Sequence, residues 1–170
     1  MNAHEPAIAA EAAPAPAMRP LASGHLKVLR ARALLAAAAL LLVALAIDGG
    51  LWRSGRAPAG VASLVALALG CYLVLILPGR RYRAWGYREE EEEIFIRSGL
   101  LVRSLRVVPF GRVQHIDVSQ GPIQRTFGVS TLTLHTAGTS GASVPLPGLE
   151  VGEAEAMRDR IRAKIRQDLV

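Results

Sequence analysis

Two long apolar runs dominate the first half of the chain. Residues 33–47 read ALLAAAALLLVALAI and residues 60–77 read GVASLVALALGCYLVLIL, and neither run contains a charged side chain. At a helical rise of about 1.5 Å per residue, the second run measures about 27 Å, and the first reaches about 30 Å if it continues to Trp52. Both lengths approach the roughly 30 Å hydrocarbon core of a bilayer. The pattern predicts two membrane-spanning helices, about 33–52 and 60–78, joined by a short, turn-rich linker.

Two other interpretations of the first run stay open. One is a buried helix of a soluble core, although such a helix usually keeps a polar stripe and this run has none. The other is a cleaved signal peptide, because basic residues, an apolar run and the sequence Ala44-Leu45-Ala46 imitate its three regions. The long segment before the run argues against cleavage. We therefore expect an uncleaved transmembrane helical hairpin within residues 31–79.

The segment before the hairpin has the composition of a tail. Residues 1–24 are rich in Ala and Pro, and large apolar residues are sparse there. Pro14, Pro16 and Pro20 would interrupt any helix. Such segments bury too little apolar surface to become ordered. We expect residues 1–30 to form a disordered cytoplasmic tail.

Basic residues are concentrated before the first helix and after the second helix of the hairpin, and few lie in the linker between them. The linker carries only Arg53 and Arg56, whereas the two outer flanks carry Arg19, Lys27, Arg30 and Arg32 on one side and Arg80, Arg81, Arg83 and Arg88 on the other. The positive-inside rule then places both termini in the cytoplasm. The chain is expected to be a multi-pass protein of the inner or plasma membrane. Basic residues beside a membrane helix can bind anionic lipid, so the possible headgroup contacts are Arg80, Arg81 and Arg83.

After residue 80 the pattern changes to short runs of period two, separated by turn residues. Alternation and β-branched residues predict about six short strands, the clearest at residues 94–97, 100–108, 113–118, 129–135 and 143–146. Residues 109–128, PFGRVQHIDVSQGPIQRTFG, organise this part of the chain. We interpret that stretch as a turn, a strand, a short irregular or helical turn, and a final turn.

One amphipathic helix is predicted over residues 150–168. Ala154, Met157, Ile161 and Ile165 recur at three- and four-residue spacing on one face. Glutamates lie near its start and basic residues later, an order that suits the helix dipole. The apolar face is expected to pack on the sheet. A helix lying on the membrane surface is the alternative, because the polar face is basic.

Composition and charge exclude several functional classes. Apolar residues make up 51% of the chain and charged residues 20%, and the net charge is +6. The positive charge permits nucleic-acid binding, but the arginines flank apolar segments, which is the usual arrangement for membrane topology. The single cysteine, Cys71, excludes an intrachain disulfide and zinc sites with two or more cysteines. The four histidines show no metal-ligand spacing, and we expect no cofactor or metal.

Two clusters of polar residues could carry chemistry. His115 and Asp117 share a strand face, so a nucleophilic triad is conceivable, but no G-x-S-x-G motif supplies a nucleophile. Residues 89–93 are five successive glutamates, which could hold a cation. Adjacent carboxylates do not converge on one point, so a solvated turn between strands is favoured. No phosphate loop or dinucleotide motif is present, and no small-molecule substrate is indicated.

The ordered pieces of the second half resemble the bacterial pleckstrin-homology-like family, specifically the small YdbS-like membrane proteins. The resemblance covers roughly residues 80–168, and the preceding hairpin fits the same proteins. The matching pieces are Tyr87, the run Ile94-Phe95-Ile96-Arg97-Ser98-Gly99-Leu100, Val108-Pro109-Phe110, Arg112-Val113-Gln114, Ile116-Asp117-Val118, Gln120-Gly121-Pro122, Arg125-Thr126-Phe127-Gly128 and His135-Thr136-Ala137-Gly138. The acidic run looks longer than the family's usual acidic turn.

The resemblance implies an α+β fold in which a two-helix transmembrane hairpin precedes a PH-like domain over residues 80–170. That domain would be cytoplasmic, with a bent β-sheet or barrel closed by the C-terminal helix. It also implies membrane attachment and a non-catalytic module. We expect this module to act in a membrane protein complex or envelope scaffold, with membrane lipid and another membrane protein, or a second copy, as partners. Recognition of anionic lipid at the cytoplasmic leaflet is the alternative. Phosphoinositide binding is not expected, because the early hairpin holds five glutamates.

Overall fold

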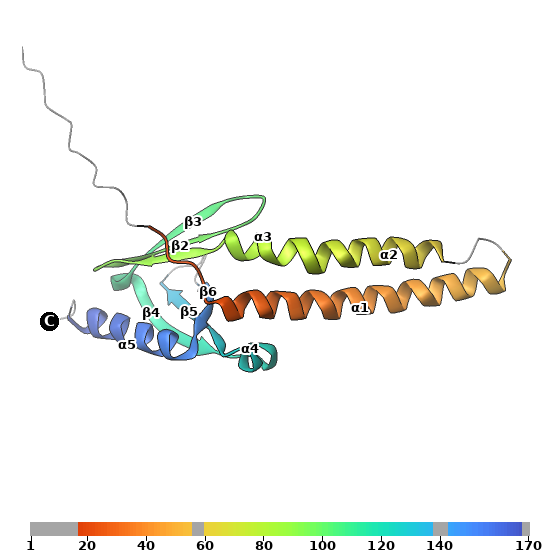
Figure 1. Ribbon diagram of the computed structural model, residues 1–170. Coiled ribbons are helices and arrows are strands. Elements are labelled where there is room, and N and C mark those ends of the chain that lie inside the picture. Colours follow the sequence, from red (N-terminus) through yellow and green to blue (C-terminus); the bar gives the residue numbers. More distant parts are fainter. Residues whose placement is uncertain (1–16, 56–59, 138–142, 168–170) are drawn as a thin grey trace, which may run out of the picture.

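The computed structural model describes residues 17–55, 60–137 and 143–167. Figure 1 shows a long helical hairpin projecting from a small β domain. Helix α1 (Ser23–Arg53) forms one arm, and the other arm consists of α2 (Val61–Cys71), a π-helical turn (Tyr72–Ile76) and α3 (Leu77–Arg83). Both arms are long and apolar enough to cross a bilayer. Large apolar side chains are exposed along both, among them Leu35, Leu42, Val43, Leu64, Val65 and Leu75.

The two arms of the hairpin pack through small residues. Ala44, Ala66 and Gly70 are buried, and a Cβ atom on Gly70 would lie 3.3 Å from the Cβ of Ala37. At the far end, the carboxylate of Asp48 accepts hydrogen bonds from the backbone of Ala62 and from both the backbone N–H and the hydroxyl of Ser63, at 2.6–3.1 Å. Asp48 thus caps the first turn of α2 across the hairpin.

The β domain consists of two three-stranded antiparallel sheets. The first has the order β1 (Gly86–Glu89), β2 (Glu93–Ser98) and β3 (Ser104–Pro109). The second has the order β4 (Val113–Ser119), β5 (Val129–Thr136) and β6 (Ser143–Glu150). Helix α5 (Val151–Gln167) closes the domain. The predicted α+β architecture is confirmed, with a hairpin of two apolar arms followed by two antiparallel sheets and a C-terminal helix.

Residues 109–128 contain the predicted turns, strand and short helix. A 3₁₀ turn (Phe110–Arg112) leads into β4, and a short helix α4 (Pro122–Thr126) leads to the turn at Gly128. The last strand is longer than predicted. β6 continues to Glu150, although it contains Pro145 and Pro147. Proline is tolerated there because β6 is an edge strand and need not donate hydrogen bonds on both sides.

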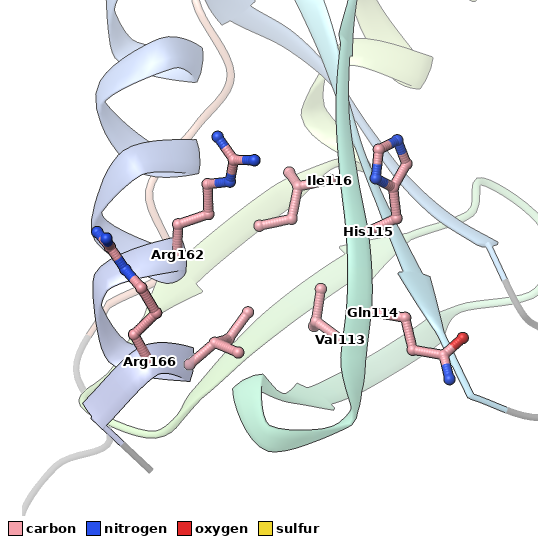
Figure 2. Close-up of a pocket in the computed structure, with 7 residues that line it drawn as sticks. Val113, Gln114, His115, Ile116, Arg162 and Arg166 are labelled. Atoms are coloured by element: carbon pink, nitrogen blue, oxygen red, sulfur yellow. The ribbon is translucent and has the colours of Figure 1, made fainter. Parts of the chain in front are cut away.

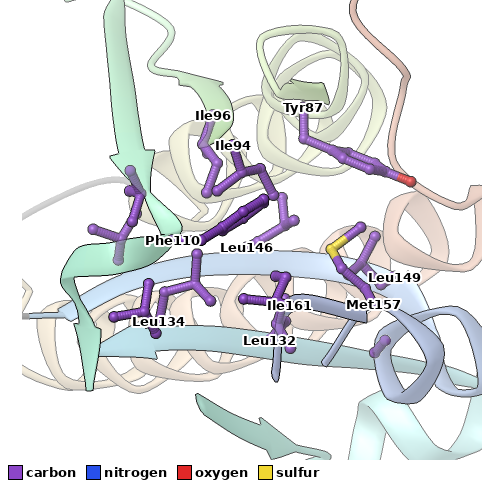
Figure 3. Packing of buried hydrophobic residues seen from close by; sticks show 14 of the residues in the cluster. Tyr87, Ile94, Ile96, Phe110, Leu132, Leu134, Leu146, Leu149, Met157 and Ile161 are labelled. Carbon is purple, nitrogen blue, oxygen red and sulfur yellow. The ribbon is translucent and has the colours of Figure 1, made fainter. Parts of the chain in front are cut away.

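The core lies between the two sheets and α5 (Figure 3). Its largest fully buried side chains come from all of these elements: Ile94, Ile96, Phe110, Leu132, Leu134, Leu146, Leu149, Met157 and Ile161. Ala154, Met157 and Ile161 are at most 1% exposed, so the apolar face of α5 packs in the core as predicted and does not lie on a membrane. The buried Tyr87 hydroxyl donates a hydrogen bond to Glu153, and burial together with this carboxylate raises the pKa of Tyr87.

The expectation of a disordered tail is wrong for residues 17–30. Arg19 and Tyr87 exchange two backbone hydrogen bonds, of 2.7 and 3.0 Å, so the chain before α1 extends the first sheet beyond β1. Leu21 is 3% exposed within the core, and its carbonyl accepts a 2.6 Å hydrogen bond from the Tyr82 hydroxyl. One well-placed leucine and free backbone groups order this segment despite its composition. Residues 1–16 lie outside the described residues.

This arrangement also bears on the signal-peptide interpretation. Cleavage after Ala44-Leu45-Ala46 would remove Leu21 from the core and the partner strand of Tyr87 from the first sheet. The base of α1 would be lost as well, and Val28 is fully buried there. The segment before the first apolar run therefore serves as part of the folded domain.

Helix α1 leaves the β domain through a close contact. A Cβ atom on Gly24 would lie 2.6 Å from the carbonyl oxygen of Phe127 and 2.7 Å from Val129. Gly148 has a φ of +74°, and a Cβ atom there would lie 2.5 Å from the ring of His25. Ala22 donates a 2.8 Å backbone hydrogen bond to the Gly148 carbonyl. Glycine at both positions lets the helix and the second sheet approach this closely.

Replacing Gly24 with alanine is expected to lower the thermal stability of the full-length protein in detergent. The new methyl group meets a backbone oxygen that cannot rotate away, so we expect a destabilisation of about 1–3 kcal/mol. Gly49→Ala is the matched control, because a Cβ atom there would meet no described atom within 4 Å apart from the neighbouring backbone of its own helix, and alanine favours a helix. Equal melting temperatures for the two variants would contradict the close contact.

Acidification is expected to weaken the same contact through His25. The imidazole is 5% exposed, and its Nδ1 has no hydrogen-bond partner among the described residues. Burial, and then the charge of Arg32, lower its pKa. Below about pH 6.5 the unfolded chain takes up a proton on His25 more readily than the folded protein does. The free energy of unfolding is therefore highest above about pH 6.5 and decreases as the pH falls below it.

The melting temperature of the native chain should therefore drop more steeply between about pH 7 and pH 5 than that of His25→Gln, which cannot take up the proton. Parallel melting curves over this pH range would rule out a contribution from His25.

Candidate functional site: a basic cavity at the base of the hairpin

The β2–β3 turn and the end of α3 meet where the helical hairpin joins the β domain. Figure 1 shows the loop between β2 and β3 alongside α3, at the end of the domain from which the two arms project. An open cavity of about 380 Å³ lies between them. Arg80, Arg83 and Ala84 line it from the end of α3. The strands β2 and β3 and the turn between them contribute Arg97, Gly99, Leu100 and Arg103.

Local structure brings the four arginines together. Arg80 and Arg83 are three residues apart in α3, so they project from the same face of the helix. Arg97 lies near the end of β2 and Arg103 directly before β3, on the two sides of one turn. The turn requires glycine, because Gly99 has a φ of +103° and a Cβ atom there would lie 1.9 Å from the Val102 carbonyl oxygen.

None of these four arginines has an ion pair or a side-chain hydrogen bond within the described part of the chain. Other cations of the β domain do have acidic partners, such as Arg160, which contacts Glu89 at 2.8 Å. All four guanidinium-bearing residues of the cavity are exposed. Guanidinium groups bind phosphate and carboxylate through paired hydrogen bonds. The cavity is therefore suited to an anion.

The same turn presents exposed apolar side chains beside this charge. Leu101 is 94% exposed and Val102 is 80% exposed, the highest values among the large apolar residues that the structure describes. Exposed apolar groups next to cations are typical of surfaces that lie at a membrane interface. The cavity and the turn form one surface, which we call the basic turn site: Arg80, Arg83, Arg97, Leu101, Val102 and Arg103.

The structure separates the three arginines predicted as headgroup contacts. Arg80 and Arg83 line the basic turn site, whereas Arg81 lines a different cavity together with Arg32, Leu73 and other residues between α1 and α3. Arg97 and Arg103 were not predicted. The sequence signal for them was the turn Arg97-Ser98-Gly99-Leu100-Leu101-Val102-Arg103, in which two arginines flank three successive large apolar residues.

The histidine cluster lies elsewhere, on the outer face of the second sheet. Asp117 contacts His115 at 2.8 Å and His135 at 3.1 Å, and all three side chains are substantially exposed. The predicted shared face of His115 and Asp117 is confirmed. No serine hydroxyl is hydrogen-bonded to either imidazole in the described ranges, and no group of His, Cys, Asp and Glu there is suited to hold a metal.

The acidic run forms the turn between β1 and β2, as the sequence favoured. Glu89 ends β1 and Glu93 begins β2. Arg160 of α5 contacts Glu89, and the Lys164 ammonium donates a 2.9 Å hydrogen bond to the Glu90 carbonyl. These contacts attach the acidic turn to α5. They give the run a structural role at the end of β2 opposite to the basic turn site.

The comparisons with known proteins agree with this architecture. The family model described as "Bacterial PH domain" matches residues 26–165. The chain is 35% identical over 143 residues to the UPF0699 transmembrane protein YdbS of Bacillus subtilis (strain 168), a match that covers 80% of this chain and 85% of that protein. It is 30% identical over 105 residues to the UPF0699 transmembrane protein YdbT of the same organism, covering 60% of this chain and 21% of YdbT.

No solved structure matches the chain. The family match begins inside α1 and therefore includes both arms of the hairpin as well as the β domain. A relative named as a transmembrane protein and two exposed apolar helices together indicate a membrane protein. The chain belongs to the bacterial PH domain family.

Proposed function

We propose that this chain is a non-catalytic, membrane-anchored PH-like module that binds the headgroup of an anionic phospholipid at the cytoplasmic leaflet. One observation carries the proposal: four arginines, which have no acidic partner among the described residues, converge beside an exposed apolar turn at the base of the hairpin. The basic residues outside the two apolar runs support a cytoplasmic position for the β domain.

The position of the arginines along the membrane helix suits a headgroup. The apolar run of the second arm ends at Leu77, and Arg80 follows three residues later. Three residues of α-helix correspond to about 4.5 Å, so Arg80 and Arg83 lie at the depth of the headgroups when Leu77 lies at the edge of the hydrocarbon core. Arg97 and Arg103 border the same cavity and would be held at a similar depth.

The energies are sufficient to hold the domain against the membrane. Each arginine near an anionic surface contributes about 1 kcal/mol. Burying a large aliphatic side chain such as Leu101 or Val102 contributes up to about 1.5–3 kcal/mol. The domain is already tethered by its two helices, so these terms need only orient it.

The distribution of charge gives the domain one face suited to the bilayer. The acidic turn and the basic turn lie at opposite ends of β2, whose six residues span about 17 Å. With the basic turn at the anionic surface, the glutamates point away from it. The early hairpin that holds phosphoinositides in eukaryotic PH domains is the acidic one here, so the proposed lipid contact is a different surface.

Assembly with another membrane protein, or with a second copy, is a second candidate role. The small residues of the hairpin do not favour it, because Ala66 and Gly70 face α1 of the same chain. The observation that favours it is the open edge of β4 beside α5.

Anionic lipid is expected to collect at the basic turn site. In a Trp52→Phe background, the fluorescence of Trp85, which is adjacent to the cavity residue Ala84, should be quenched more by brominated phosphatidylglycerol than by brominated phosphatidylcholine in reconstituted bilayers. Arg97→Gln combined with Arg103→Gln should reduce this preference about tenfold, since each charge is worth about 1 kcal/mol. These two positions lie outside the flank that sets topology.

Arg106→Gln is the matched control, because this exposed arginine on β3 does not line the cavity. Raising the salt concentration to about 0.5 M should also reduce the preference. If the double variant keeps the preference for phosphatidylglycerol of the native protein, the proposed headgroup contact is wrong.

The apolar turn is expected to enter the membrane interface. A nitrobenzoxadiazole label attached at Val102→Cys, in a Cys71→Ala background, should show blue-shifted emission in bilayers and quenching by spin-labelled lipid tails. A label at Gly111→Cys, in the 3₁₀ turn near the acidic end of the domain, should remain in water. Identical emission at both positions would mean that the domain does not face the bilayer with this turn.

A further inference from the structure

A second cavity lies between β4 and the C-terminal half of α5. Its volume is about 460 Å³, and Figure 2 shows Arg162 and Ile116 extending into the space between the two elements. Val113, Ile116 and Ile165 supply an apolar floor. Arg162 and Arg166 supply the charge on the helix side. We call this surface the β4–α5 groove.

The strand that borders the groove has an open edge. β4 pairs with β5 on one side, and the described residues place no strand on its other side. The edge of β1 is paired with Arg19, and the edge of β6 is approached by Ala22, which donates to the Gly148 carbonyl. Unpaired backbone groups at a strand edge are a template for another extended segment.

The two arginines of the groove form no ion pair within the described part of the chain. Arg160 and Lys164 of α5 are engaged with the acidic turn, but Arg162 and Arg166 have no ion pair or side-chain hydrogen bond there. Asp117, on the same strand β4, is bonded to His115 and His135 on the outer face of the sheet. The groove is therefore suited to an acidic occupant.

The spacing of the two arginines matches an extended chain. Arg162 and Arg166 are four residues apart in α5, which corresponds to about 6 Å along the helix axis. Alternate residues of a β-strand are separated by about 6.6–6.8 Å and point to the same side. Two carboxylates at alternate positions of a strand added to β4 would therefore match the spacing of the two arginines, and Figure 2 shows Arg162 extending toward β4.

The position of the groove excludes the protein's own bilayer as the occupant. Figure 1 shows α5 running away from the helical hairpin, and the groove lies beside its distal half. A lipid headgroup in the membrane that holds α1 and α2 could not reach Arg166 without inverting the domain. A protein segment meets no such restriction.

We infer that the β4–α5 groove binds an extended acidic segment of a partner protein by strand addition to β4, with acidic residues at alternate positions facing Arg162 and Arg166. The inference deepens the second candidate role, assembly with another protein, and does not depend on lipid binding. The apolar floor shields these ion pairs from water and so strengthens them. The backbone of the edge supplies affinity, and the arginine spacing supplies selectivity.

The test uses the full-length protein in nanodiscs of neutral phosphatidylcholine and three labelled eight-residue peptides. One alternates Val and Glu, one alternates Val and Lys, and one is the Val–Glu peptide with a methyl group on every backbone nitrogen, which keeps the charge but removes the backbone donors. We expect fluorescence anisotropy to show binding of the Val–Glu peptide only. Hydrogen exchange should slow at β4 amides when this peptide binds.

Arg162→Gln combined with Arg166→Gln should weaken binding of the Val–Glu peptide about tenfold, while Arg97→Gln combined with Arg103→Gln should leave it unchanged. Equal binding of the Val–Glu peptide and its N-methylated form would overturn strand addition, and unchanged affinity in the Arg162 and Arg166 double variant would overturn the groove. If that double variant instead loses the preference for brominated phosphatidylglycerol, the groove is a lipid site and the inference is wrong. The lipid assay at Arg97 and Arg103 is independent, so the two proposals can fail separately.

Discussion

The position of the β domain depends on how the segment before α1 packs into it. Arg19 extends the first sheet beside Tyr87, Leu21 enters the core, and α1 then leaves along the second sheet through the contact of Gly24 with Phe127. The second arm returns through α3, which leads almost directly into β1. Two connections without a flexible linker hold the domain at a defined orientation to the hairpin. The described segment before α1 is thus an element of the fold.

Because of these two connections, the basic and acidic turns of the β domain have a defined orientation relative to the helical hairpin. The basic turn site lies at the end of β2 next to the hairpin, and the acidic turn lies at the other end. A freely hinged domain could present any face to the membrane. Here the same residues that complete the core hold the basic and apolar turn beside the base of the hairpin, which is why we assign lipid contact to this surface.

The side chains of α5 have three different structural roles. Ala154, Met157 and Ile161 fill the core, Arg160 and Lys164 hold the acidic turn, and Arg162 and Arg166 line the β4–α5 groove. The helical period separates these roles, because residues one or two positions apart point in different directions. The lipid and protein surfaces that we propose are therefore on different elements, and one chain could use both at once.

Local pattern was sufficient to predict much of this protein. The uninterrupted apolar runs predicted the two apolar helices, and the spacing of Ala154, Met157 and Ile161 predicted the core face of α5, because such periodicity reflects burial. Only the tertiary structure decided that residues 17–24 are ordered, that Arg97 and Arg103 join Arg80 and Arg83 while Arg81 faces elsewhere, and that β4 has an open edge beside two arginines. The reason is that these features depend on contacts between residues distant in sequence, which local composition does not encode.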